Sequence, residues 1–219
     1  MAPQSRIWSA LLLAGMLAQG GHSQTLNKGE RQRAAAELEA SRRLLLRAVS
    51  GLHEAQWRFR PTPDRWSIAE CVEHVALAED SYYELIVGKL LKSTADPTKL
   101  AEVRGKDDLV VKQMADRSSK RITAPALEPK GRWARPSQAV GYFQKSRDRL
   151  IRYVRTTKDN LRDHTQAHRA VGLIDGYQWI LLASGHVRRH VEQIQEVRAH
   201  PSFPGGRRSR RDVPAPPAR

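Results

Sequence analysis

The chain has 219 residues, of which 40% are hydrophobic, 28% charged and 6% aromatic; this suits one compact domain with tails and excludes a collagen or a multi-pass membrane protein. The 38 Lys and Arg residues against 23 Asp and Glu give a net charge of +15, which makes acidic partners worth testing but names no function. The single cysteine, Cys71, excludes an intrachain disulfide and any site built from several thiolates. A metal site in this chain therefore needs histidines or carboxylates.

Residues 1–23 have the pattern of a secretory signal peptide. Arg6 supplies the positive start, an apolar run follows at 7–17, and small residues come after it: Gly20, Gly21 and Ser23. The run is about half of the ~20 residues that a membrane-spanning helix needs, so the segment is predicted to be cleaved. We expect a mature protein that begins near Gln24, has no membrane span, and is secreted or periplasmic in a bacterium.

The other end of the chain, 205–219, is a basic tail that is rich in Pro and Arg. Such a composition predicts disorder, and the folded domain is therefore expected at 24–204. Five Arg residues follow residue 206, but no aromatic residue lies between them to stack on bases, and the chain has no groove-reading motif. Nucleic acid is not an expected partner.

Two amphipathic helices are predicted in the first half of the domain. From about 25 to 52, apolar residues recur at helical spacing among charged ones, which is typical of a helix with one face in a core. A proline-bearing stretch then ends this helix. Ser67, with Glu70 three residues later, forms the capping-box pattern that starts the second helix, which is expected to run to about Leu91.

Two more helices are predicted after a long connection. Residues 93–135 are charged and interrupted by Pro and Gly, with room for a short helix at 109–117. The third helix is expected to start at Pro136, and the fourth at Asp175, which has Gln178 three residues later. No strand pattern competes with the helices. The fold class expected is all-α: a four-helix bundle with a long crossover connection between helices two and three.

Three histidines are candidate metal ligands. His186 and His190 are four residues apart on the fourth helix, so they lie on one face, beside its apolar stripe. His74 lies on the apolar face of the second helix, so it also points toward the interior. A second pair with the same spacing, His164 and His168, stands in a polar segment without an apolar period and is interpreted as loop.

Other polar or aromatic residues near these histidines have structural interpretations. The capping box already uses Glu70, and the carboxylates of Glu73 and Glu192 project elsewhere, so salt bridges are expected of them and no general base is identified. Cys71 lies on the His74 face but is expected to be a small core residue. The tryptophans are expected to pack in the core: Trp57, Trp66, Trp133 and Trp179.

Three segments of the chain resemble the DinB-like superfamily of metal-binding bundles. They are WSIAECVEHVALAE, RPSQAVGYFQKSRDRLIRYV, and LIDGYQWILLASGHVRRHVEQIQEV followed by HPSFP, and the likeness extends from about 30 to 204. The resemblance implies that His74, His186 and His190 together bind a divalent ion, and that His168 is a loop residue. Imidazole ligands suit Zn, Ni, Fe or Cu, and Mn is also open, so the identity of the ion is not decided.

The resemblance implies three classes of function. An ion on three imidazoles keeps an open position for water, which predicts a metal-dependent hydrolase. Relatives also include thiol-dependent transferases and isomerases, although low-molecular-weight thiols are chiefly cytosolic and the predicted signal peptide argues against them here. A bundle that binds a metal or small ligand without catalysis is the third alternative. The partner expected is a small-molecule substrate of unknown identity, and relatives often form homodimers.

Overall fold

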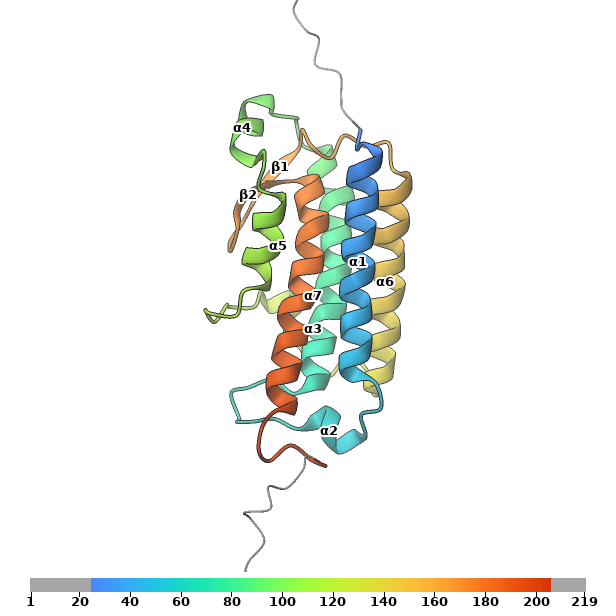
Figure 1. Cartoon of the computed structure of the whole chain (residues 1–219), viewed down its shortest axis with the longest axis vertical. Helices are drawn as coiled ribbons and strands as arrows, with labels where there is room; N and C mark the ends of the chain where they lie inside the picture. The colour runs from blue at the N-terminus through green and yellow to red at the C-terminus, as the bar shows by residue number, and fades with distance from the viewer. Residues whose placement is uncertain (1–24, 206–219) are drawn as a thin grey trace, which may run out of the picture.

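The computed structural model describes residues 25–205, so the predicted signal peptide and nearly all of the basic tail lie outside the described residues. Four long helices run side by side along the longest axis of the molecule (Figure 1). They are α1 (Lys28–Val49), α3 (Ile68–Gly88), α6 (Pro136–Thr156) and α7 (Gly176–Arg198). The prediction of an all-α four-helix bundle is confirmed. None of the helices in the described part of the chain combines the length and apolarity that a bilayer span requires.

Capping boxes start three of the four long helices. The side chains of Asn27, Ser67 and Asp175 each accept a hydrogen bond from the backbone N–H three residues later. Glu or Gln at that later position bonds back to the cap, so that two N–H groups left free at the helix start are satisfied. The sequence patterns at Ser67 and Asp175 therefore predicted the correct starts of the two helices that carry the candidate histidines.

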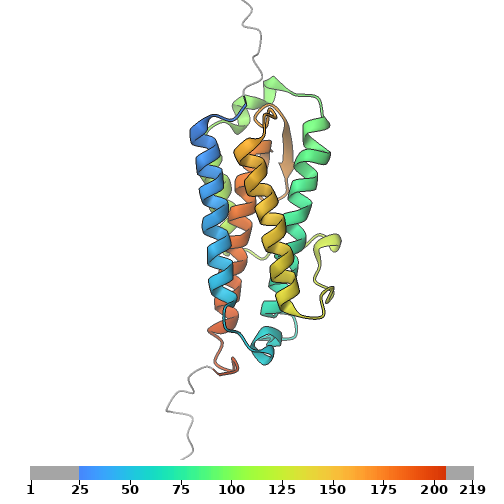
Figure 2. The same cartoon turned by 90° about the vertical axis from the view of Figure 1, so that its right-hand side faces the viewer.

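The direction of the helices explains the long crossover. In Figures 1 and 2, α1 and α7 run from the top of the molecule to the bottom, whereas α3 and α6 run from the bottom to the top. A chain that leaves the top of α3 must return along the whole bundle to enter α6 at the bottom. Residues 89–135 make this return and contain these short helices: η1 (Leu90–Lys92), η2 (Pro97–Lys99), α4 (Leu100–Val103), α5 (Asp107–Ala115) and η3 (Pro125–Leu127).

Helix α5 packs closely against α7, at a glycine beside the candidate histidines. A Cβ atom added at Gly185 would lie 2.7 Å from the backbone oxygen of Val111 and 3.0 Å from the Cβ of Met114. Only glycine permits this approach without displacing α5. The short helix predicted at 109–117 is thus present two residues earlier, and it covers α7 on one side.

The remaining two connections differ from what the sequence predicted. A short helix, α2 (Glu54–Arg58), lies in the connection between α1 and α3. Between α6 and α7 the chain forms an antiparallel hairpin of β1 (Thr165–His168) and β2 (Gly172–Asp175). The prediction that the chain has no strand is wrong. Each strand has only four residues, too few to show an alternating pattern, and the hairpin depends on Gly172 with a φ of 75°.

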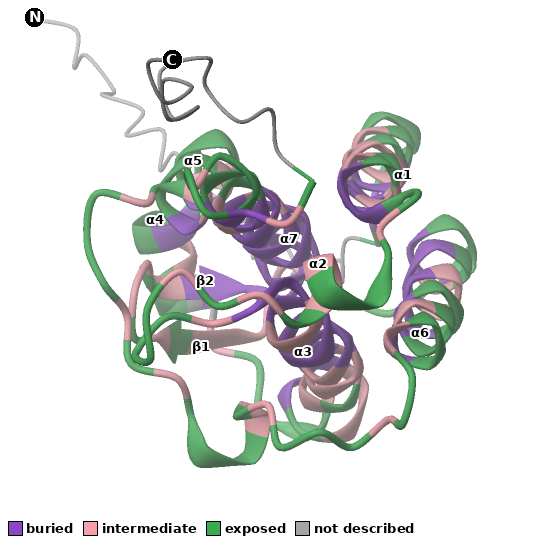
Figure 3. Cartoon of the chain, turned by 90° about the horizontal axis from the view of Figure 1, so that it is seen from below, coloured by how far each residue is buried: buried purple, intermediate pink, exposed green. Residues whose placement is uncertain are grey.

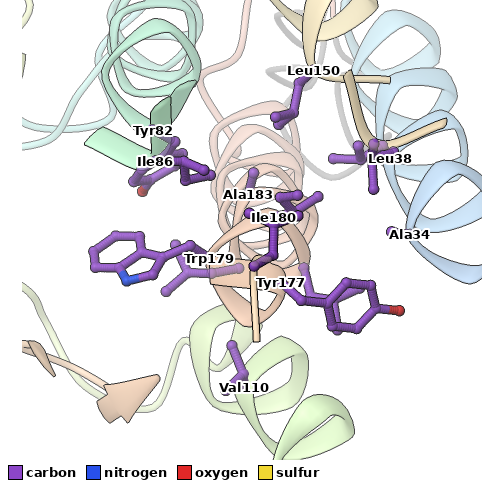
Figure 4. Packing of buried hydrophobic residues seen from close by; sticks show 14 of the residues in the cluster. Ala34, Leu38, Tyr82, Ile86, Val110, Leu150, Tyr177, Trp179, Ile180 and Ala183 are labelled. Carbon is purple, nitrogen blue, oxygen red and sulfur yellow. The ribbon is translucent and has the colours of Figure 1, made fainter. Parts of the chain in front are cut away.

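The core consists of two apolar clusters along the bundle axis: an upper cluster packed around the first half of α7 and a lower cluster packed around its second half. Figure 4 shows side chains from α1, α3, α5 and α6 surrounding the first half of α7. Seen from below in Figure 3, α3 and α7 are buried over much of their surface, whereas α1 and α6 have exposed outer faces. Buried polar residues stand near the boundary between the clusters: Ser41, Glu79, Ser146, Arg147, Ser184 and His186.

Candidate metal centre

The structure brings His74, His186 and His190 together in the lower half of the bundle, between α3 and α7. His74 is in the second turn of α3, and the other two are one turn apart on α7. The three residues are 5%, 5% and 6% exposed, so all three imidazoles are inside the protein. One nitrogen from each ring lies within 4.8 Å of the others. The periodicity of the sequence therefore identified the correct faces of both helices.

The three rings face one another through the same nitrogen atom. The Nε2 atom of His186 lies 3.1 Å from Nε2 of His74 and 3.2 Å from Nε2 of His190. Metal–imidazole bonds of about 2.0–2.1 Å at tetrahedral angles place two ligand nitrogens about 3.3 Å apart. The observed separations are close to that spacing, so the donor set fits one small divalent ion.

Hydrogen bonds on the far side of two rings leave Nε2 free to bind a metal. The Nδ1 atom of His74 lies 2.9 Å from the backbone oxygen of Leu127, and Nδ1 of His190 lies 2.9 Å from the side-chain oxygen of Gln193. Both partners are acceptors, so the ring proton is on Nδ1 and Nε2 carries a lone pair. His186 can donate a proton to only one of its two neighbours. At least one lone pair in this buried cluster thus has no donor, and a bound cation would satisfy it.

Burial keeps the three imidazoles in the neutral form that binds metals. Loss of solvent lowers the pKa of His74 below 6.5, and it lowers the pKa of His186 and His190 well below that value. Neighbouring histidines and the guanidinium of Arg189 lower the pKa of the two α7 histidines further. The lowered pKa values therefore favour metal binding over protonation at these nitrogens.

Aromatic side chains enclose the cluster. The ring of Trp66 lies 5.0 Å from that of His74 and 6.2 Å from that of His190, and Tyr82 contacts the ring of His186 edge-on at 5.6 Å. Trp66 also packs against the lower apolar cluster, and Trp179 belongs to the upper one, in line with the packing role predicted for them. These rings limit the access of bulk water to the three nitrogens.

Cys71 is a core residue, as predicted. It is fully buried in the lower cluster, and burial raises the pKa of its thiol far above the usual range. A thiol that keeps its proton is a poor metal ligand.

The carboxylates near the site are engaged with other groups. Glu70 accepts hydrogen bonds from Ser67 and pairs with Arg60. Glu73 pairs with Arg132 and also accepts backbone hydrogen bonds, and these contacts hold its pKa below 4.5 even though burial acts in the opposite direction. The salt bridges expected of these two residues are confirmed. Glu192 is exposed and forms no ion pair within 25–205, so the expectation is wrong for this residue.

The second histidine pair is outside the site. His164 lies in the loop before β1, as predicted, whereas His168 is the last residue of β1 and not a loop residue. Pairing with Gly172 fixes its backbone, and its ring packs at 5.2 Å from that of Trp179. Neither residue belongs to the cluster of three histidines.

Sequence reasoning missed the groups that orient the ligands. Gln193 stands three residues after His190 on the same helix, and that spacing could have indicated the contact. Leu127 contributes only a backbone oxygen, which any residue type supplies, and its contact with His74 joins residues 53 apart in sequence. No pattern of residue types could have revealed it.

The fold and the site define a class: a four-helix bundle with three buried histidines whose nitrogens could hold one metal ion. The sequence profile of the DinB superfamily matches residues 37–194, and the chain belongs to this family.

Among solved structures, the bundle is similar to that of YfiT from Bacillus subtilis, with a TM-score of 0.51 and 16% identity over 80% of this chain and 89% of that one. YfiT is described as a probable metal-dependent hydrolase with an unusual four-helix bundle topology. At this identity the likeness shows the fold alone. None of the curated proteins matches the sequence.

Proposed function

We propose that this protein is a metal-dependent hydrolase whose divalent ion is bound by His74, His186 and His190. The observation that carries the proposal is the convergence of three buried Nε2 atoms at 3.1 and 3.2 Å. Three neutral imidazoles leave the charge of an ion uncompensated, and such an ion acts as a Lewis acid that activates water for attack on a carbonyl or phosphoryl group. The description of YfiT as a probable metal-dependent hydrolase supports the same chemistry.

Different residues around the three histidines have different roles at such a site. Leu127 and Gln193 hold the rings of His74 and His190 so that Nε2 faces the ion. Trp66 and Tyr82 cover the edges of the rings and exclude bulk water. Glu70 and Glu73 have their oxygens in other hydrogen bonds, so neither is assigned the role of a base that accepts the proton of the attacking water.

The proposal is tested by turnover that depends on both the metal and the ligands. Purified protein is assayed on panels of ester, amide and phosphate substrates before and after chelation, beside His186→Ala and the control His164→Ala. We expect hydrolysis that chelation abolishes, that the added ion restores, that His186→Ala lacks and that His164→Ala retains. Turnover that requires an added thiol would instead establish a transferase. A full complement of metal without any turnover would establish a binding protein.

We also propose that residues 1–23 are a cleaved signal peptide. The support is the positive start and the apolar run at 7–17, which is shorter than a membrane span. The intact mass of the protein recovered from a periplasmic extract should correspond to a chain that begins near Gln24. A chain that retains Met1 and stays with the cytoplasmic fraction would contradict this assignment.

A further inference from the structure

The crossover segment 116–132, between α5 and α6, is fastened to the bundle at two points beside the three histidines. At one end, the guanidinium of Arg189 donates to the backbone oxygens of Asp116 and Ser119, the latter at 2.7 Å. At the other end, Glu73 accepts hydrogen bonds from the backbone of residues 130–132. Each of these two charged side chains directly precedes a candidate ligand in the sequence. The segment is thus held by residues whose backbone positions also place the ligands.

Several N–H groups of residues 130–132 converge on the carboxylate of Glu73. Its Oε1 atom accepts from the backbone N–H of Lys130 at 2.8 Å and of Arg132 at 3.2 Å, and its Oε2 atom accepts from that of Gly131 at 2.9 Å. Gly131 has a φ of 71°, a conformation that lets successive N–H groups point toward one acceptor. The guanidinium of Arg132 adds a bond of 3.0 Å to Oε1.

Four donors on the carboxylate of a buried residue hold this part of the segment firmly. Three of these four bonds reach Oε1 and one reaches Oε2, so both oxygens of Glu73 are tied to the segment.

The same segment supplies the group that orients His74. Leu127 stands three residues before Lys130, and its backbone oxygen accepts the Nδ1 proton of His74 at 2.9 Å. Arg132 also donates to the backbone oxygen of Glu128 at 2.7 Å, which ties the stretch from Leu127 to Arg132 into one turn. The side chains of neighbouring residues on a helix point about 100° apart, so those of Glu73 and His74 bond to this turn from two directions.

We propose that Glu73 is a positioning residue for the metal centre: it anchors the turn 127–132, and thereby fixes the Leu127 oxygen that sets the ring orientation and tautomer of His74. This inference rests on the proposed function only in taking His74 as a ligand. A residue that orients a ligand through its far nitrogen acts on metal affinity, and loss of such a partner commonly weakens binding 10- to 100-fold.

The decisive variant is Glu73→Gln, with Glu70→Gln as its matched control. Glutamine has the same length as glutamate, but one of its two acceptors becomes a donor that opposes the backbone N–H groups of the turn. Glu70 lies one turn earlier on α3, and its carboxylate bonds to Ser67 and Arg60 instead of the segment; glutamine serves in a capping box as well as glutamate does. Arg132→Met is a milder second variant: it removes the side-chain donor to Glu73 and the bond to the Glu128 oxygen, but it leaves the three backbone donors to Glu73 in place.

Two measurements separate positioning from a general role in folding. Zn²⁺ affinity is measured by competition with a chromophoric chelator, and the tautomer of His74 is read from the ¹⁵N shifts of its ring in the metal-free protein. We expect Glu73→Gln to bind Zn²⁺ about 10- to 100-fold more weakly and to lose the pure Nδ1–H form of His74. Arg132→Met should shift both readouts in the same direction by less, and Glu70→Gln should change neither.

The outcomes are distinguishable from a failure of the proposed function. Unchanged affinity in Glu73→Gln, or weaker affinity with His74 still held as the Nδ1–H tautomer, would overturn the role of Glu73 while the metal site stands. If the wild-type protein binds no Zn²⁺, the metal proposal fails, and the His74 tautomer in the metal-free variants still decides whether Glu73 orients that ring.

Discussion

Two groups of buried polar side chains lie between the same helices, and they differ in whether their hydrogen-bonding capacity is used. Arg147 is fully buried on α6 and donates to both oxygens of Glu79, to Ser41, and to the backbone oxygens of Leu38 and Ala183. All five N–H groups of the guanidinium are therefore satisfied, by partners on α1, α3 and α7. Because every donor of this guanidinium has a partner within the chain, we call the group around Arg147 the closed cluster.

The three histidines, about one turn away along α7, form an open cluster. Their Nε2 atoms point at one another, and the available ring protons cannot satisfy them all. The two clusters have similar burial, so burial alone does not distinguish a structural group from a functional one. A closed network fixes how the helices pack, whereas an open one requires a partner from outside the chain.

The largest effect is expected when the closed cluster is broken. Arg147→Met would leave the carboxylate of Glu79 buried without a counter-ion, and we expect a loss of about 3–5 kcal/mol in the free energy of unfolding. Urea denaturation followed by circular dichroism measures this loss. The double variant Arg147→Met with Glu79→Leu should recover most of it, because the unpaired charge is then gone. A single variant as stable as the wild type would show that the ion pair does not hold the helices.

The second effect concerns the open cluster and the stabilisation that a ligand supplies. Zn²⁺ at about 100 times its dissociation constant should stabilise the wild-type protein by about 2.7 kcal/mol, and chelation should reverse the gain. The combined variant His74→Ala, His186→Ala and His190→Ala should show no difference between the two conditions. Thermal unfolding with and without chelator measures this effect. An equal Zn²⁺-dependent shift in that variant would place the ion elsewhere.

A third effect tests a histidine outside both clusters. Burial, with the nearby charges of Arg121 and Arg169, lowers the pKa of His168 to about 4, below its ordinary 6.5. As the pH falls, His168 therefore takes up a proton at a higher pH in the unfolded chain than in the folded one. The contribution of neutral His168 to stability is complete above pH 6.5 and is lost as the pH falls toward 4. His168→Gln should reduce the fall in stability between pH 7 and pH 4.5 in denaturant titrations. An identical fall in the variant would show that His168 does not contribute to the pH dependence of stability.

The smallest effect is expected at Cys71. Cys71→Ala removes one buried sulfur atom from the lower apolar cluster and should cost about 1 kcal/mol of stability. The metal content should not change, because the thiol keeps its proton and is not a ligand. Loss of the ion in this variant would mean that Cys71 belongs to the site.

The contrast between the clusters also shows what the sequence could predict. Helix starts depend on residues three apart, such as Ser67 with Glu70, and the His186–His190 pair depends on one turn of one helix. Such local patterns led to the four helices and the three histidines. The partners of Arg147 are 68 and 106 residues away in sequence at Glu79 and Ser41, so the closed cluster emerges only once the helices pack.

The elements that the sequence did not predict have similar physical causes. The hairpin at 165–175 has strands too short for an alternating pattern. The contact between Glu73 and the turn at 130–132 uses backbone N–H groups, which carry no sequence signal of their own. Both features depend on how the connections fold back on the bundle, and the sequence pattern of a single helix does not predict such contacts.

The central claim is that the open cluster holds one ion, and metal content tests it most directly. The protein is purified from its own cell compartment without chelators or nickel resin, beside His186→Ala, and both are measured by elemental mass spectrometry. The account predicts about one divalent ion per chain in the wild-type protein and none in the variant. A wild-type protein without metal that also takes up none on dialysis, or a variant that keeps its ion, would contradict it.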